Sequence, residues 1–248
     1  MAHAAAIPVD RGTLAASSAP KVQSAPVSPG KVAMWLFLAT EIMFFTGLIG
    51  TYIVLRAGSP AIAYSDSYSP GQVPKDVAIV NPSAKVYSWP LPYDQHTNPL
   101  SIDLTAFNTF VLICSSVSMV LALSAVQRGD KKKLTFWLLI TVLFGSFFLG
   151  VQVYEYRSLM FEHIYPKGIS ASGHFTPNVS LFASCFFTMT GFHGAHVAGG
   201  VVMLICLLLQ SLRGKYTESH HSPVELVGLY WHFVDLVWII LFTIVYLL

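Results

Sequence analysis

Charged residues are scarce in this sequence. Aspartate, glutamate, lysine and arginine make up 10% of the 248 residues, whereas a soluble domain carries about 25%. Apolar residues reach 54%, and the mean hydropathy is +0.61. This shortage of charge excludes an ordinary soluble globular domain and indicates an integral membrane protein.

Cysteine and net charge are low as well. The chain has three cysteines, Cys114, Cys185 and Cys206, and all of them lie inside apolar runs without a C-x-x-C spacing. This arrangement predicts neither a disulfide framework nor a zinc site. The net charge of +2 provides no basic surface for nucleic acid. We therefore expect no nucleic-acid partner and no metal bound by this chain.

The first 30 residues lack the apolar core of a cleaved signal peptide. They are rich in alanine, serine, proline and valine and hold few large apolar side chains. Because so little apolar surface can offset the entropy of ordering, residues 1–30 are predicted to form a flexible N-terminal extension.

Apolar runs dominate the rest of the chain. Each is long enough to cross a hydrocarbon layer of about 30 Å at about 1.5 Å per helical residue. The sequence thus predicts an all-α integral membrane five-helix bundle over residues 31–248, with a polar outer loop at 57–105. The predicted helices lie near residues 33–55, 106–127, 134–156, 179–210 and 226–248.

Basic residues are distributed unevenly between the predicted loops. With a cytoplasmic N-terminus, five of the 14 lysines and arginines fall on the outer side, and the other nine fall on the inner side. Because lysine and arginine concentrate in short cytoplasmic loops, we predict a cytoplasmic N-terminus and a periplasmic, or outside, C-terminus. The inner residues are Arg11, Lys21, Lys31, Arg128, Lys131, Lys132, Lys133, Arg213 and Lys215.

Two ionisable residues interrupt the last apolar run, His232 and Asp235. Such groups are costly inside a membrane and normally face other helices. Trp231, Asp235 and Trp238 recur at helical spacing and share a face. One interpretation is a buried hydrogen-bonded pair that fixes helix packing, and the other is a ligand or proton site.

Glu41 lies inside the first apolar run, with Phe37, Phe44 and Phe45 about one turn away. We expect its side chain to be buried and either uncharged or hydrogen-bonded. In the predicted topology the first and last helices run in the same direction. Glu41 and Asp235 are each about ten residues from the inner end, so they are expected to share one layer.

A second polar layer is predicted nearer the outer surface. It comprises Gln152 and Glu155 late in the third helix and His193 and His196 on the fourth. The two histidines share a helical face, so together with His232 they could bind a bis-histidine haem in a stand-alone membrane cytochrome. Structural hydrogen bonding of intramembrane histidines is the commoner arrangement.

Several segments, in this order, resemble the subunit III family of haem–copper terminal oxidases, that is, cytochrome c oxidase subunit 3. The resemblance covers roughly residues 31–248 and corresponds to a short five-helix bacterial form. It rests on MWLFLATEIMFFTG from Met34, FNTFVLICSSVS from Phe107, RGDKKK from Arg128, QVYEY from Gln152, TGFHGAHV from Thr190 and HHSPVELVGLYWHFVDLVW from His220.

The resemblance implies a non-catalytic subunit of a proton-translocating cytochrome-c oxidase in aerobic electron transport. Such a subunit would lie in the bacterial cell (inner) membrane as a multi-pass protein beside subunits I and II, with a small subunit IV left open. It would stabilise subunit I, hold phospholipids and support proton uptake. Haem and copper would belong to the partner subunits, and this chain would interact with cytochrome c only indirectly. A quinol oxidase or a nitric-oxide-reductase-associated homologue is the alternative.

The resemblance also marks residues. Glu41 matches the family's carbodiimide-reactive glutamate, whereas no catalytic residue is expected in this chain. The family's long form has two further N-terminal helices that this chain lacks, and the basic residue that ends the fourth helix, Arg213, falls about one turn late. The expected buried polar, lipid-cleft or proton-related residues are Trp35, Glu41, Glu155, His193, His196, Arg213, His232 and Asp235.

Overall fold

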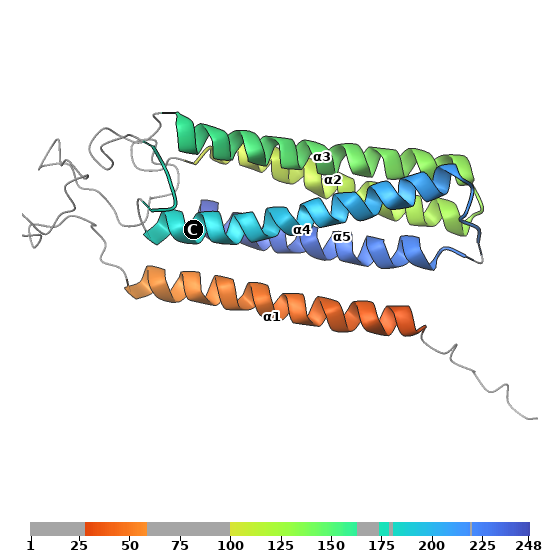
Figure 1. Ribbon diagram of the computed structural model, residues 1–248, viewed down its shortest axis with the longest axis horizontal. Coiled ribbons are helices and arrows are strands. Elements are labelled where there is room, and N and C mark those ends of the chain that lie inside the picture. The colour runs from red at the N-terminus through yellow and green to blue at the C-terminus, as the bar shows by residue number, and fades with distance from the viewer. Residues whose placement is uncertain (1–27, 59–99, 163–173, 179–180, 219) are drawn as a thin grey trace, which may run out of the picture.

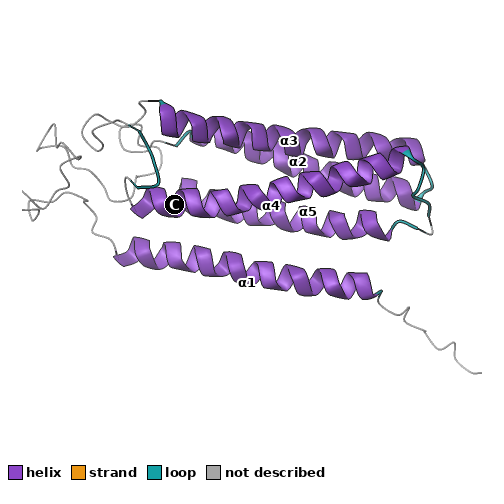
Figure 2. Cartoon of the chain, in the orientation of Figure 1, coloured by secondary structure: helices purple, strands orange, loops and turns teal. Residues whose placement is uncertain are grey.

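The computed structural model describes residues 28–58, 100–162, 174–178, 181–218 and 220–248. Every regular element in these ranges is helical (Figures 1 and 2). Five helices are long and apolar enough to cross a membrane, which confirms the predicted all-α five-helix membrane bundle. They are α1 (Pro29–Gly58), α2 (Ile102–Gln127), α3 (Lys131–Phe161), α4 (Leu181–Leu212) and α5 (Ser222–Phe242), and α5 continues into a π-helical segment (Thr243–Leu247).

Most helices extend beyond the predicted apolar runs. The 31 residues of α3 span about 46 Å, which is more than the hydrocarbon layer of about 30 Å. The helix therefore tilts in the membrane or its ends project beyond that layer. Helix α2 begins at Ile102, within the predicted outer loop. Nearly all of the predicted extension 1–30 and residues 59–99 of that loop lie outside the described residues.

Helices α2 to α5 pack together, and α1 lies along one side of them (Figure 1). Only three side chains of α1 are buried, Leu38, Phe45 and Tyr52, and they recur every seven residues. A stripe this narrow buries far less surface than the packed faces of α5, where ten residues are buried. Helix α1 is therefore the most weakly held of the five.

The packing of α5 centres on Trp231. The indole is buried, and its Nε1 donates a hydrogen bond of 3.0 Å to Ser115 Oγ on α2. A Cβ atom on Gly145 of α3 would lie 2.6 Å from the ring, and one on Gly200 of α4 would lie 2.8 Å from it. The two glycines thus form the space that the indole occupies.

The turn between α2 and α3 is defined by two residues. Gly129 has a φ of +74°, in the left-handed region that favours glycine. Asp130 is the N-cap of α3, and its side chain accepts a hydrogen bond of 3.1 Å from the Lys133 amide. That hydrogen bond holds the pKa of Asp130 below its usual range. The sequence Gly-Asp therefore ends one helix and starts the next.

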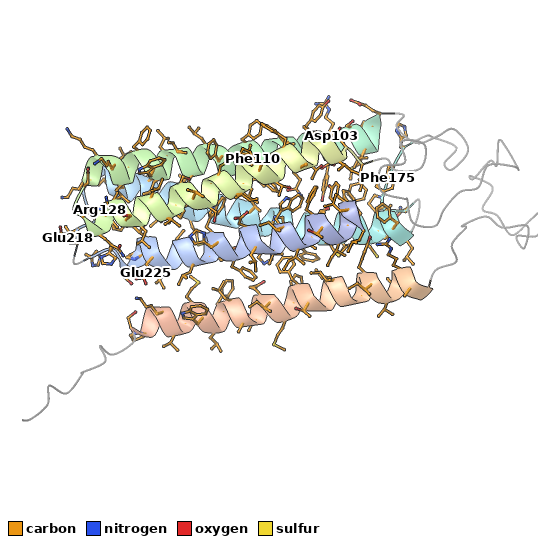
Figure 3. All side chains as sticks on the ribbon, turned by 180° about the vertical axis from the view of Figure 1, so that it is seen from behind. Asp103, Phe110, Arg128, Phe175, Glu218 and Glu225 are labelled. Atoms are coloured by element: carbon orange, nitrogen blue, oxygen red, sulfur yellow. The ribbon has the colours of Figure 1, made fainter. Side chains whose placement is uncertain are left out.

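Helices α1 and α5 run in the same direction, as predicted. Lys31 at the start of α1 forms a 2.7 Å ion pair with Glu225 at the start of α5. At the other end, Arg56 donates a hydrogen bond to the backbone carbonyl of Leu248. Figure 3 shows Arg128 and Glu225 at one end of the bundle and Asp103 at the opposite end.

A test of the indole site is available within α3. Gly145→Ala is expected to lower the stability of the detergent-purified protein by about 1–3 kcal/mol, because the new methyl group overlaps Trp231. Gly150→Ala on the same helix is the control, since its Cβ would lie more than 4 Å from every described atom outside that helix. Thermal unfolding of both variants measures the difference, and equal midpoints would contradict this account of the packing.

Candidate functional site

Glu41 and His196 form an ionisable pair between α1 and α4. Glu41 Oε2 lies 2.9 Å from His196 Nε2, and the two side chains are 18% and 20% exposed. The other ring nitrogen, Nδ1, lies 2.7 Å from the backbone carbonyl of Phe192. A carbonyl oxygen can only accept a hydrogen bond, so Nδ1 carries a hydrogen and donates a hydrogen bond to this carbonyl.

This tautomer restricts the charge state of the pair. A hydrogen bond between Nε2 and Oε2 needs one further proton, which lies on either the carboxyl group or the imidazole. In the first case both groups are neutral, and in the second a carboxylate faces an imidazolium. The hydrogen-bonded pair therefore holds one shared proton and has no net charge in either form.

Aromatic side chains surround this pair. The ring centroids of Phe45 and His196 are 5.1 Å apart in an edge-to-face arrangement, and the ring of Phe44 stacks on that of His196 with centroids 6.3 Å apart. Tyr230 of α5 donates a hydrogen bond of 3.0 Å to the backbone carbonyl of His196. The site thus joins α1, α4 and α5, and aromatic rings of α1 contact its imidazole.

Glu155 occupies a separate buried site near the end of α3. Tyr246 donates to both carboxylate oxygens at 3.3 Å, and Thr105 donates to Oε1 at 3.2 Å. Tyr246 belongs to the π-helical segment after α5, and Thr105 to α2. Glu155 therefore joins three elements that the sequence separates widely.

His193 has a third kind of environment. Its ring is fully buried and stacks on Trp238, with centroids 4.8 Å apart. Among the described residues neither ring nitrogen has a hydrogen-bond partner. Gln152 instead donates a 2.8 Å hydrogen bond to the backbone carbonyl of Thr190. The predicted second layer is thus divided among separate sites, because each side chain leaves its helix in a different direction.

Asp235 and His232 lie against α2. Asp235 is 6% exposed, and its carboxyl group interacts with Ser116. The Ser116 hydroxyl also lies 2.5 Å from His232 Nδ1. Ser116 therefore links the two side chains. Sequence reasoning missed this residue, although the serine-rich segment of α2 was a signal for hydroxyl groups that bond across helices.

The remaining predicted residues differ in their surroundings. Glu41 and Asp235 face different helices, since α1 packs beside α4 and α5 whereas Asp235 interacts with Ser116 of α2. Trp35 is 60% exposed because it lies off the buried stripe of α1. Arg213 follows the end of α4 and is exposed. Neither of the latter two residues belongs to the buried polar groups.

The three candidate haem-ligating histidines have different surroundings. Both nitrogens of His196 are already hydrogen-bonded, His193 is stacked on Trp238, and His232 binds Ser116. Within the described ranges, no three histidine, cysteine, aspartate or glutamate side chains form a group that could hold a metal ion. The geometry brings polar residues into helix contacts and does not gather them at one centre.

Five apolar helices joined by buried polar contacts define a multi-pass helical membrane protein. The family model described as cytochrome c oxidase subunit III matches residues 12–248. The chain belongs to the cytochrome c oxidase subunit III family, as the sequence motifs predicted. It is a subunit of an oxidoreductase complex and therefore has other oxidase subunits as partners.

Individual relatives agree with this assignment. The cytochrome c oxidase subunit 3 of Alkalihalophilus pseudofirmus is 31% identical over 217 residues, which cover 88% of this chain and 85% of the relative. That of Synechocystis sp. is 35% identical, covering 86% and 73%. A probable quinol oxidase subunit 3 of Staphylococcus epidermidis is 31% identical, covering 88% of both chains.

The Asp235 contact can be tested through assembly. Asp235→Leu removes the carboxyl group beside Ser116 and is expected to lower the amount of this chain recovered with the other oxidase subunits. The expected cost is about 1–3 kcal/mol, because a buried polar interaction is lost. Asp235→Asn retains hydrogen bonding and should have a smaller effect. Wild-type recovery of Asp235→Leu would show that the contact is dispensable.

The pair of Glu41 and His196 can be tested by a double-mutant cycle. Glu41→Leu, His196→Leu and the double variant should give a coupling free energy of about 1 kcal/mol, typical of a hydrogen bond between membrane helices. Thermal unfolding in detergent supplies the values. Ile42→Leu replaces Glu41→Leu in the control cycle, because Ile42 is exposed. A coupling energy equal to that of the control would contradict the contact.

Proposed function

We propose that this chain is the non-catalytic subunit III of a proton-pumping haem–copper oxygen reductase of the cytochrome c oxidase type. In this proposal it stabilises subunit I, retains phospholipids and supports proton uptake in a bacterial cell membrane. The observation that carries the proton role is the Glu41–His196 pair, which holds one shared proton at the contact of α1 with α4.

Proton support follows from the chemistry of that pair. Its proton can move between a carboxyl oxygen and an imidazole nitrogen without a change in net charge. Such a move avoids the large cost of creating an isolated charge in a membrane. Both side chains also retain some exposure, at 18% and 20%. The pair is thus suited to hold a proton near a partner subunit, while oxygen chemistry occurs elsewhere in the complex.

Stabilisation by partners follows from the position of α1. Only a narrow stripe of this helix is buried, whereas Leu36, Met43 and Val54 are among its exposed apolar residues. Lipid chains and apolar helices of another subunit can both cover such a surface. The proposal assigns this surface to phospholipid and to subunit I.

Cytochrome c is the proposed ultimate electron donor, reached through partner subunits. Two of the relatives described above are named cytochrome c oxidase subunits. The relative named as a quinol oxidase subunit has a similar identity and coverage, and it supports the alternative. Mass spectrometry of the co-purified subunits separates the two. A subunit II with a copper-binding domain or a fused cytochrome c supports cytochrome c, and a subunit II lacking both contradicts it.

A stand-alone cytochrome is the contrasting hypothesis. The visible spectrum of the separately purified chain tests it directly. A stoichiometric Soret band with bis-histidine character would contradict the proposed non-catalytic role. Haem absorption found only in the assembled complex would support that role.

A cytoplasmic N-terminus completes the proposal. The N-terminal end of α1 lies at the same end of the bundle as the α2–α3 and α4–α5 turns (Figure 1), and these turns carry the basic cluster Arg128–Lys133 as well as Arg213 and Lys215. Concentrated basic charge favours the cytoplasmic side.

Cysteine labelling tests this orientation. In intact cells, an impermeant thiol reagent added outside should leave Lys132→Cys unmodified and should modify Arg157→Cys, which lies toward the other end of α3 and is exposed. Permeabilisation should allow both to react. The unsubstituted chain controls for its three own cysteines. Labelling of Lys132→Cys from outside intact cells would contradict the proposed orientation and indicate the opposite one.

Glu41→Gln tests the supporting role. This change keeps the side-chain shape and removes the ability to form a carboxylate. We expect the assembled variant to retain initial oxygen reduction and to lose activity or lipid faster during sustained turnover. Oxygen consumption followed over many turnovers measures the effect, with Glu162→Gln at the exposed end of α3 as the control. Immediate abolition of oxygen reduction would contradict a supporting role.

A further inference from the structure

A pocket of about 510 Å³ lies where the start of α3 meets the end of α4. Its lining includes Lys131 and Lys132 from the first turn of α3, Ser211 from the last turn of α4, and Gly214 from the turn that follows α4. The pocket shares no residue with the Glu41–His196 pair or with the Glu155 and Asp235 sites. It is therefore a separate feature of the molecule.

The polar side of the pocket is cationic. Lys131 and Lys132 are exposed, and neither forms an ion pair among the described residues. The next residue, Lys133, differs because it pairs with Asp130 at 3.0 Å. No acidic residue is among the described residues that line the pocket. Arg213, between the lining residues Leu212 and Gly214, adds an exposed positive charge nearby.

The membrane side of the pocket is apolar. Phe136 and Leu139 follow Lys132 by four and seven residues, so they extend from it along one face of α3. Leu212 of α4 completes this apolar wall, and all three side chains are exposed. A hydrogen bond of 2.7 Å between Thr135 and Ser211 holds the two helices together at the pocket.

We propose that this pocket binds one anionic phospholipid. The phosphate group lies between Lys131 and Lys132, and an acyl chain lies along Phe136, Leu139 and Leu212. The order of the lining, cationic at the helix end and apolar toward the membrane, matches the order of these groups in a lipid. Free phosphate would leave the apolar wall uncovered, and a zwitterionic headgroup would place its own cation beside the lysines.

Photo-crosslinking in vesicles tests the site. The assembled oxidase is reconstituted in phosphatidylcholine with a trace of phosphatidylglycerol that carries a photoreactive acyl chain. Crosslinks are expected on the α3 and α4 peptides that contain Phe136, Leu139 or Leu212. Because each lysine beside an anionic lipid contributes about a fivefold preference, Lys131→Gln/Lys132→Gln should reduce crosslinking about thirtyfold.

The control removes the same charge outside the pocket. Arg128→Gln/Lys133→Gln alters the same turn at two residues that do not line the pocket, and crosslinking should fall by less than about fivefold. Equal losses in the two double variants would overturn the proposal, since charge in the turn would then act without a specific site. Equal crosslinking by a phosphatidylcholine probe, or displacement by inorganic phosphate, would also overturn it.

A second variant tests the apolar wall without changing any charge. It therefore remains a test even if the lysine double variant fails to assemble. Leu139→Trp keeps both lysines and fills the space assigned to the acyl chain. Crosslinking to the α3 and α4 peptides should fall at least about tenfold, as expected when a bulky ring displaces a lipid chain. Undiminished crosslinking at these peptides in this variant would overturn the assignment of the wall.

Discussion

The fit of Trp231 between two glycines determines how α5 faces its neighbours. Gly145 and Gly200 leave room for the indole, and Ser115 accepts its N–H group. With this side chain fixed, the following turn directs Asp235 toward α2. Tyr230, one residue earlier, reaches α4 instead. A single buried ring thus sets the rotation of the helix and thereby the separation of the polar sites.

This separation explains which parts of the structure could be predicted. The five membrane helices follow from long apolar runs, since the cost of exposing backbone groups to lipid leaves few other structures. Their facing surfaces were harder to predict. Both sides of such a helix are apolar, because one meets lipid and the other meets protein, so periodicity alone does not distinguish them. Glu41 and Asp235 were accordingly expected to share one layer, but the sequence did not show that they face different helices.

Family resemblance and side-chain contacts supplied different information. The motifs identified the polar residues of α1, α4 and α5, but they did not show that Glu41 meets His196 across 155 positions of the sequence. Ser116 was missed because the serine-rich segment of α2 does not indicate which hydroxyl group meets which neighbouring helix. Only the packed structure reveals that its hydroxyl lies between His232 and Asp235.

The contacts of α1 also have a consequence for synthesis of the chain. Lys31 pairs with Glu225, and Arg56 binds the carbonyl of Leu248, 192 positions later. At translation rates of about 5–20 residues per second, α1 leaves the ribosome about 10–40 s before its last contact exists. For most of this interval the carboxyl group of Glu41 lacks His196, which lies 155 positions later in the sequence. Until then, contacts with the insertion machinery or with a neighbouring subunit would stabilise the nascent helix by covering this polar side chain.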